Sequence, residues 1–177
     1  MIDIREAIQQ AEAISRKYNP EGLAPFPFDK IKEGFKDLDI ISTDELPEDV
    51  SGAIIYRKDA KKYIIFNNNK KHPNRQHFTI AHELGHYFLH KNELSSENIL
   101  VDADTTLDSN GIFFRLDHAE TTKIETQANN FAATLIMPER LVQEVWEKLN
   151  DVEEAAKIFK VSLSAMSIRL EKLGLVA

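Results

Sequence analysis

Apolar residues recur every three or four positions in several stretches of the chain, which is the spacing of one helix face. The first such stripe contains Ile4, Ile8 and Ile14 and stops at Asn19-Pro20, a pair that breaks a helix. Pro138 separates two later stripes, because it ends one helix and suits the first turn of the next. The predicted helices cover residues 3–18, 29–35, 73–90, 119–136 and 138–149.

Two short runs of β-branched and aromatic residues, 52–56 and 62–66, predict strands. The segment between them has the length of a hairpin connection, and residues 39–42 are a further candidate strand. Residues 91–117 are polar and predict a long, partly irregular segment that forms one rim of a cleft. The expected fold class is therefore α+β, with a small antiparallel sheet packed on the helix over 73–90.

The C-terminal stretch, residues 151–177, has the pattern of two short helices joined at Val161-Ser162. This pattern is similar to a helix-turn-helix, and a serine after the joint would cap the second helix. Its basic residues are matched by acidic ones, whereas a module that reads DNA should be basic. We therefore expect one main domain over 1–150 and a helical pair over 151–177 that packs on it.

Composition narrows the functional classes. The formal net charge of −7 argues against direct binding to nucleic acid through a broad basic surface. The chain has no cysteine, so a metal ion would have to be held by histidine and carboxylate. No apolar run approaches the length needed to cross a bilayer, and the N-terminus does not have the pattern of a signal peptide. A cytoplasmic location without membrane contact is expected.

The candidate chemistry centres on His82-Glu83-x-x-His86, within the predicted helix 73–90. Residues four apart lie one above the other on a helix, so the two imidazoles can share one zinc ion. Glu83 lies next to His82 and still faces the cleft, where a general base for an attacking water is needed. We therefore assign His82 and His86 as metal ligands and Glu83 as the catalytic base.

Glu125 is the favoured third ligand. It falls early in the predicted helix 119–136 at an otherwise core-facing position, where a carboxylate is costly unless it is paired or bound to metal. The alternative is a surface acid stabilised by the helix dipole. His90 and His118 are rival ligands, but a straight helix carries His90 about 6 Å beyond His86 and out of reach. Asn129, one turn after Glu125, could accept a hydrogen bond from a ligand histidine.

These motifs together resemble the ImmA/IrrE family of zinc metallopeptidases, over about residues 52–175. One departure is His77, where the family often has Arg or Lys. The tail pairs Val161-Ser162 and Arg169-Leu170 also match. The two main matching segments are Arg75-Gln76-x-Phe78-Thr79-Ile80-Ala81-His82-Glu83-Leu84-Gly85-His86 and Glu125-x-x-Ala128-Asn129-x-Phe131-Ala132-x-x-Leu135-Ile136-Met137-Pro138.

The resemblance implies a compact α+β metallopeptidase with Zn²⁺ on His82, His86 and Glu125, and Glu83 as base. It also implies a regulatory role, since family members cleave or inactivate a DNA-binding repressor that is often encoded beside them in mobile elements or stress operons. The expected partner is therefore a helix-turn-helix repressor. Two alternatives stay open: a non-catalytic protein that binds a repressor or DNA, and a zinc hydrolase with another substrate. The candidate donors to the oxyanion are Tyr56, Tyr63, Tyr87 and His118.

Overall fold

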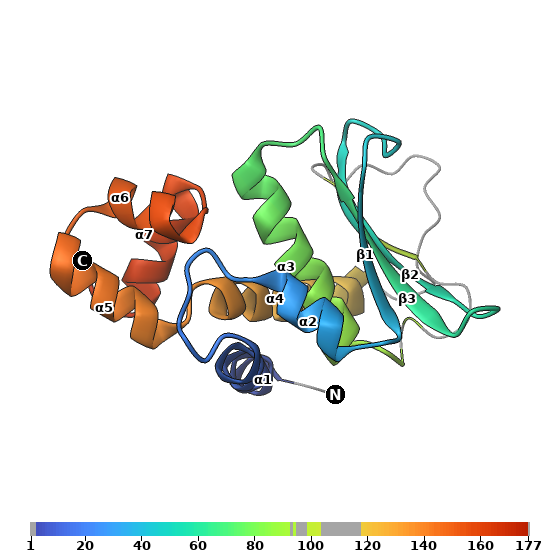
Figure 1. The fold of residues 1–177 in the computed structure, drawn as a ribbon, viewed down its shortest axis with the longest axis horizontal. Coiled ribbons are helices and arrows are strands. Elements are labelled where there is room, and N and C mark those ends of the chain that lie inside the picture. Colours follow the sequence, from blue (N-terminus) through green and yellow to red (C-terminus); the bar gives the residue numbers. More distant parts are fainter. Residues whose placement is uncertain (1–2, 93, 95–98, 104–117, 177) are drawn as a thin grey trace.

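The computed structural model describes residues 3–92, 94, 99–103 and 118–176 (Figure 1). A sheet lies at one end of the molecule, the C-terminal helices lie at the other, and long helices run between them. The elements are α1 (Ile4–Tyr18), α2 (Phe28–Gly34), β1 (Leu38–Thr43), β2 (Val50–Arg57), β3 (Lys62–Asn68), α3 (Pro73–Leu89), β4 (Ile99–Ala103), α4 (His118–Ile136), α5 (Glu139–Leu149), α6 (Val152–Phe159) and α7 (Leu163–Lys172).

The α+β class is confirmed, and the sheet, within the described residues, has the order β1-β3-β2-β4. The predicted hairpin is antiparallel, with Ile54 of β2 opposite Ile65 of β3. The sheet is mixed rather than antiparallel throughout, because β3 inserts between β1 and β2 and so runs parallel to β1. β4 pairs antiparallel with the other side of β2. It lies inside the segment that the sequence predicted as partly irregular.

The long helix α3 begins and ends where the sequence predicted. His72 caps its start by accepting a hydrogen bond from the Asn74 amide at 3.2 Å, and Pro73 occupies the first turn, where its missing amide hydrogen costs nothing. At its other end the His90 amide donates to the His86 carbonyl at 2.9 Å. The helix packs against α4 and against β2 and β3 of the sheet. Most of its second half is therefore buried, ligand candidates included.

The C-terminal helices are joined as the sequence predicted. Asp151 caps α6, and Lys160 ends it with a left-handed backbone, φ 54°. Ser162 then caps α7 by accepting from the Ala165 amide at 3.1 Å. These caps satisfy amides that would otherwise have no partner in the first turn, each worth about 1 kcal/mol.

Contacts between the C-terminal helices and the rest of the chain are polar as well as apolar. The Asn74 side chain donates to the Val161 carbonyl at 2.8 Å, and buried Arg169 donates to the Met137 carbonyl at 2.9 Å. Phe159 and Leu170 are fully buried in the same core as the side chains of α1, α3 and α4. Each such apolar side chain contributes roughly 1.5–3 kcal/mol of burial. The division at residue 150 stays a prediction.

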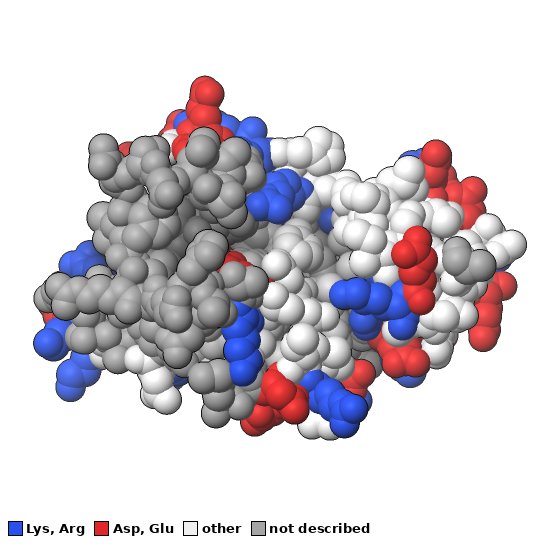
Figure 2. All heavy atoms as spheres, turned by 180° about the vertical axis from the view of Figure 1, so that it is seen from behind, with Lys and Arg blue, Asp and Glu red and all other residues white. Residues whose placement is uncertain are grey.

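Charges of both signs are interspersed on the face shown in Figure 2, including the part of it formed by the C-terminal helices. Across the described residues, none of the helices combines the length and the apolar character that a bilayer span requires.

Candidate metal centre

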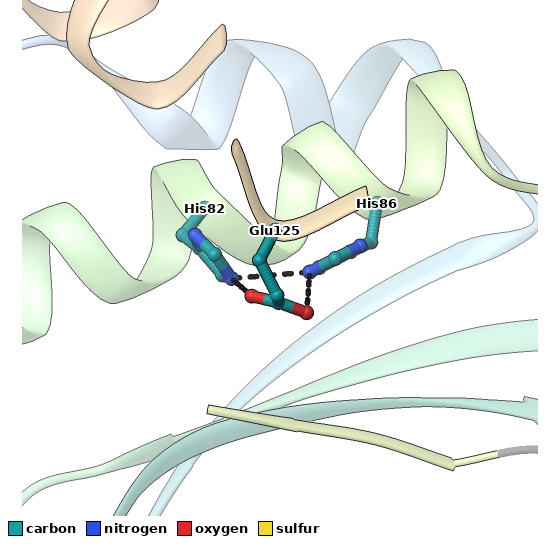
Figure 3. A group of neighbouring side chains, drawn as sticks. All are labelled: His82, His86 and Glu125. Atoms are coloured by element: carbon teal, nitrogen blue, oxygen red, sulfur yellow. Dashed lines mark hydrogen bonds and ion pairs between the residues drawn. The ribbon is translucent and has the colours of Figure 1, made fainter. Parts of the chain in front are cut away.

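Three side chains from two helices converge on one point (Figure 3). His82 and His86 project from α3, and their Nε2 atoms lie 3.0 Å apart. Glu125 reaches them from α4, with Oε2 3.1 Å from the His82 Nε2 and Oε1 3.4 Å from the His86 Nε2. The structure thus brings together the three residues that the sequence predicted as metal ligands.

Glu125 can reach the histidines because α3 and α4 approach closely at Gly85. A Cβ atom added to Gly85 would lie 3.0 Å from the Ala128 Cα and 3.1 Å from its carbonyl oxygen. A side chain at this position would therefore push the two helices apart. Glu125 precedes Ala128 by about one helical turn, so the close crossing at Gly85 also sets the distance from Glu125 to the imidazoles.

The protonation states of the group suit a cation. His82 and His86 are 3% and 1% exposed. Burial lowers the pKa of His86 to about 4, so its imidazole is neutral near pH 7. Burial alone would raise the pKa of Glu125, but the adjacent imidazoles of His82 and His86 outweigh this effect and hold the pKa well below its usual value. Neutral imidazole and ionised carboxylate are the forms that bind metal.

Asn129 contacts His82 as the sequence predicted, with its Oδ1 3.0 Å from the His82 Nδ1. An amide oxygen only accepts, so the proton of the neutral imidazole lies on Nδ1 and Nε2 presents a lone pair. That lone pair faces the Glu125 carboxylate, which also offers only lone pairs when ionised. Acceptors that converge in this way repel unless a cation lies between them. The donor set therefore fits a divalent metal ion.

Glu83 lies on the neighbouring face of α3, toward the sheet, and is 1% exposed. Its Oε1 would be 3.4 Å from a Cβ added to Gly52 of β2, and the Thr79 methyl would be only 2.4 Å from that Cβ. The glycine therefore lets α3 approach the strand and leaves room for the carboxylate. The sequence motif singled out Glu83 but gave no role to Gly52, whose only signal was a glycine inside a strand pattern.

The rival residues lie elsewhere. The His90 ring is buried behind His86, with their Nδ1 atoms 3.1 Å apart, and it is not part of the converging group. Tyr87 is fully buried, and its hydroxyl donates to Asp37 at 2.8 Å. Tyr63 packs edge-on against Tyr87 at 5.2 Å. The side chain of His118 lies outside the described residues.

Tyr56 joins the same aromatic group, since its ring lies 4.8 Å from that of Tyr63 across the β2–β3 hairpin. The three tyrosines are thus tied to one another, and Lys91 covers two of them, 3.9 Å from the Tyr87 ring centroid and 5.0 Å from that of Tyr63. This aromatic cluster was not foreseen from the sequence, because its members come from separate elements. These contacts suit a structural role near the C-terminal end of α3.

A helix with His-Glu-x-x-His, a glutamate from a second helix and a small mixed sheet define a class of α+β domains built around a divalent-metal site. The IrrE N-terminal-like domain, a peptidase family, matches residues 37–171. The chain belongs to this family, and the resemblance to ImmA and IrrE is confirmed.

Two curated relatives share this region. Metallopeptidase ImmA of Bacillus subtilis (strain 168) is 30% identical over 127 residues, which cover 70% of this chain and 64% of the relative. The radiation response metalloprotease IrrE of Deinococcus radiodurans is 32% identical over 111 residues, covering 60% of this chain and 30% of the relative. The chain therefore spans less than two thirds of the length of either relative.

A solved structure shares the fold. A Mycobacterium tuberculosis transcriptional regulator superposes with a TM-score of 0.61 at 17% sequence identity, over 96% of this chain and 48% of that one. At this identity the likeness concerns the arrangement of the elements alone.

Proposed function

We propose that this protein is a zinc-dependent endopeptidase. The observation that carries the proposal is the convergence of His82, His86 and Glu125, with the buried carboxylate of Glu83 on the adjacent face of the same helix. Family membership and the names of the two relatives support the same activity. A purely structural metal site would not need an acidic residue beside the first histidine.

Zinc is the proposed ion because of the ligands. Two imidazoles and one carboxylate, with no thiolate, are the ligand set of many catalytic zinc sites, which keep a further position for water. Metal analysis of the purified protein should find about one zinc per chain, whereas His82→Ala should carry far less. A preparation that retains full zinc in both His82→Ala and His86→Ala would rule out this centre.

The chemistry follows from the positions of the side chains. When bound, the metal would activate a water molecule and polarise the substrate carbonyl. A carboxylate oxygen of Glu83 takes one proton from the water while the water oxygen bonds to the carbonyl carbon. The same carboxylate then passes that proton to the amide nitrogen as the carbon–nitrogen bond breaks. Asn129 keeps the His82 proton on Nδ1 throughout.

We further propose that the substrate is a helix-turn-helix repressor in the cytoplasm, cut in an extended segment. Support comes from the family resemblance and from the need of a peptidase site for an extended peptide, which a folded domain offers only at a linker or a frayed end. The chain should be incubated with a repressor encoded beside it, and the products identified by mass spectrometry. Chelator-treated protein is the control, and restored zinc should restore cleavage.

The proposed docking surface lies in residues 151–177. Leu163 and Ile168 of α7 are 50% and 53% exposed, whereas Phe159 and Leu170 belong to the core, so deletion of the tail would damage the fold. Leu163→Ser with Ile168→Ser should slow cleavage of the repressor more than cleavage of a short peptide spanning the same bond. Leu149→Ser, at a 43% exposed leucine of α5, is the matched control.

The alternative is a regulator that binds a repressor without cutting it. A repressor that is released from DNA but remains intact after long incubation with the zinc-loaded protein would favour this alternative. Direct contact of the chain with DNA is not part of the proposal, because the net charge is −7.

A further inference from the structure

A chain of three buried polar side chains lies behind the proposed metal ligand His86. The Gln127 Oε1 is 2.8 Å from the His90 Nε2, and the His90 Nδ1 is 3.1 Å from the His86 Nδ1. Gln127, His90 and His86 are 3%, 2% and 1% exposed. Three buried polar groups in series are costly unless each hydrogen bond is made in a consistent direction.

Gln127 fixes which atom donates and which accepts in each of these hydrogen bonds. Its amide oxygen only accepts, so the His90 Nε2 carries the proton of a neutral imidazole. The Nδ1 of His90 is then a bare acceptor, and the contact at 3.1 Å requires the proton of His86 to lie on Nδ1. The Nε2 of His86 is left with a lone pair that points to His82 and Glu125.

We infer that Gln127 and His90 are positioning residues that hold His86 in the tautomer able to bind the metal. The inference deepens the proposed metal site and rests on it. Two residues of α4 would then fix the two tautomers. Asn129 fixes that of His82 by direct contact, and Gln127 fixes that of His86 through His90. Residues two apart point to nearly opposite flanks of a helix, which explains why Gln127 needs an intermediary.

An amide oxygen thus orients each of the two histidines, His82 directly and His86 through one intervening side chain. His82 meets an amide oxygen directly at 3.0 Å, and His86 meets one through a second imidazole. Outer hydrogen bonds of this kind orient a ligand and commonly change metal affinity by 10- to 100-fold when removed. His90, which the sequence placed out of reach of the metal, supports the metal centre in this role from behind His86.

The first test reads the tautomer in metal-free protein, by ¹⁵N NMR of the imidazole nitrogens. In the wild type, His86 should be protonated on Nδ1 and His90 on Nε2. In Gln127→Met, which keeps the bulk and loses the acceptor, His86 should show a mixture of tautomers. Gln143→Met makes the same change on the exposed surface of α5 and should alter neither histidine.

The second test measures zinc affinity by competition with a chelator. Gln127→Met and His90→Leu should weaken binding by roughly 10- to 100-fold. His90→Gln keeps an acceptor for the His86 Nδ1 proton, so it should retain most of the affinity and make a further Gln127→Met change nearly silent. This double variant also serves if Gln127→Met alone does not fold.

A wild-type His86 protonated on Nε2 would overturn the inference, as would unchanged tautomer and affinity in Gln127→Met. Loss of affinity in His90→Gln equal to that in His90→Leu would also overturn it. A wild type with the inferred tautomers that binds zinc but cuts no peptide would leave the inference standing and reject the proposed peptidase. The two failures are therefore distinguishable.

Discussion

Helix α3 makes two close contacts at glycines, one with α4 and one with β2, and each positions a different part of the candidate site. At Gly85 it meets α4, where an added Cβ would lie 3.0 Å from the Ala128 Cα. At Gly52 it meets β2, where an added Cβ would lie 2.4 Å from the Thr79 methyl. The contact with α4 brings Glu125 to the two histidines, and the contact with β2 accommodates the Glu83 carboxylate.

The difference teaches that the proposed metal site and the proposed proton acceptor depend on separate packing surfaces of one helix. The α4 contact is lined by the proposed ligands and their hydrogen-bonded partners, namely Asn129 behind His82 and His90 behind His86. The β2 contact is set by a backbone position in a strand. Substitutions at one contact should therefore leave the function of the other largely intact.

The largest expected effect is the loss of turnover on substitution of Glu83, at the contact of α3 with β2. Glu83→Gln keeps the size of the side chain but cannot take a proton, so turnover should fall by roughly 10²- to 10⁴-fold. Zinc content and thermal unfolding should stay near wild type. Cleavage rates on one peptide, measured beside metal analysis of the same sample, check this. A Glu83→Gln variant that cuts at the wild-type rate would remove Glu83 from the chemistry.

The next largest expected effect is the loss of zinc affinity on substitution of Glu125, at the contact of α3 with α4. Glu125→Gln removes the ligand charge while it keeps the shape, so zinc affinity should fall by more than the roughly 10- to 100-fold typical of an outer hydrogen bond. Chelator competition measures this loss. Glu144→Gln, an exposed glutamate of α5 paired with Arg140, is the control and should not change affinity. Equal affinities of the wild type and Glu125→Gln would point to a different third ligand.

A smaller pair of effects compares the two glycines directly. Gly85→Ala and Gly52→Ala overpack their contacts, so each should lower the free energy of unfolding by roughly 1–3 kcal/mol. Gly85→Ala should also weaken zinc binding, whereas Gly52→Ala should lower turnover with zinc affinity preserved. Denaturant titrations, chelator competition and rates measure the three quantities. The comparison fails if both variants lose zinc affinity equally.

The strand-side contact allows a rescue. Thr79→Ser removes the methyl group that lies closest to an added Cβ at Gly52. In the Gly52→Ala background it should therefore recover part of the lost stability and turnover. The Phe66 carbonyl, 2.9 Å from the same Cβ, limits the recovery.

The smallest expected effect lies outside both contacts, at His77. Burial lowers the pKa of this residue to about 4, with a further contribution from the charge of Lys160, and the ring packs on Phe28 at 4.8 Å. The unfolded value is near 6.5, so the unfolded chain binds the proton first. The associated stability is complete above about pH 6.5 and is lost as the pH falls toward about 4.

His77→Phe keeps an aromatic ring against Phe28 and removes the titration. Between about pH 7 and pH 5.5, the wild type should therefore lose roughly 1 kcal/mol more of its unfolding free energy than the variant does. Urea titrations at the two pH values measure the difference. Parallel pH profiles of the two proteins would show that His77 is protonated equally in the folded and unfolded states.

Local patterns predicted much of the fold. The α3 helix and the β2–β3 hairpin were foreseen because their signals are contiguous: a helical stripe after a Pro, and two β-branched runs around a short turn. The approach of Glu125 to the histidines was foreseen because a charged residue at a core-facing helix position needs a partner. The contact of Asn129 with His82 was foreseen because Asn129 lies one turn after Glu125 on the same helix face.

Other features depend on how separate elements meet. Nothing local in residues 99–103 shows that they pair with β2, and the parallel pairing of β1 with β3 follows from insertion rather than from composition. The hydrogen bond of His90 with Gln127 joins the end of α3 to the middle of α4. A one-dimensional pattern carries no signal for such a contact.

The strand order β1-β3-β2-β4 also bears on how the chain reaches its native state. The central pair is a local hairpin that continues directly into α3, so these elements can form early at a small loop-closure cost. The outer strands and α4 must be recruited from farther along the chain. Both histidines would then be in place before Glu125 arrives, and metal would bind tightly only after the last long-range step. Bound metal would favour the completed fold by mass action, so acquisition of the ion should report the end of folding.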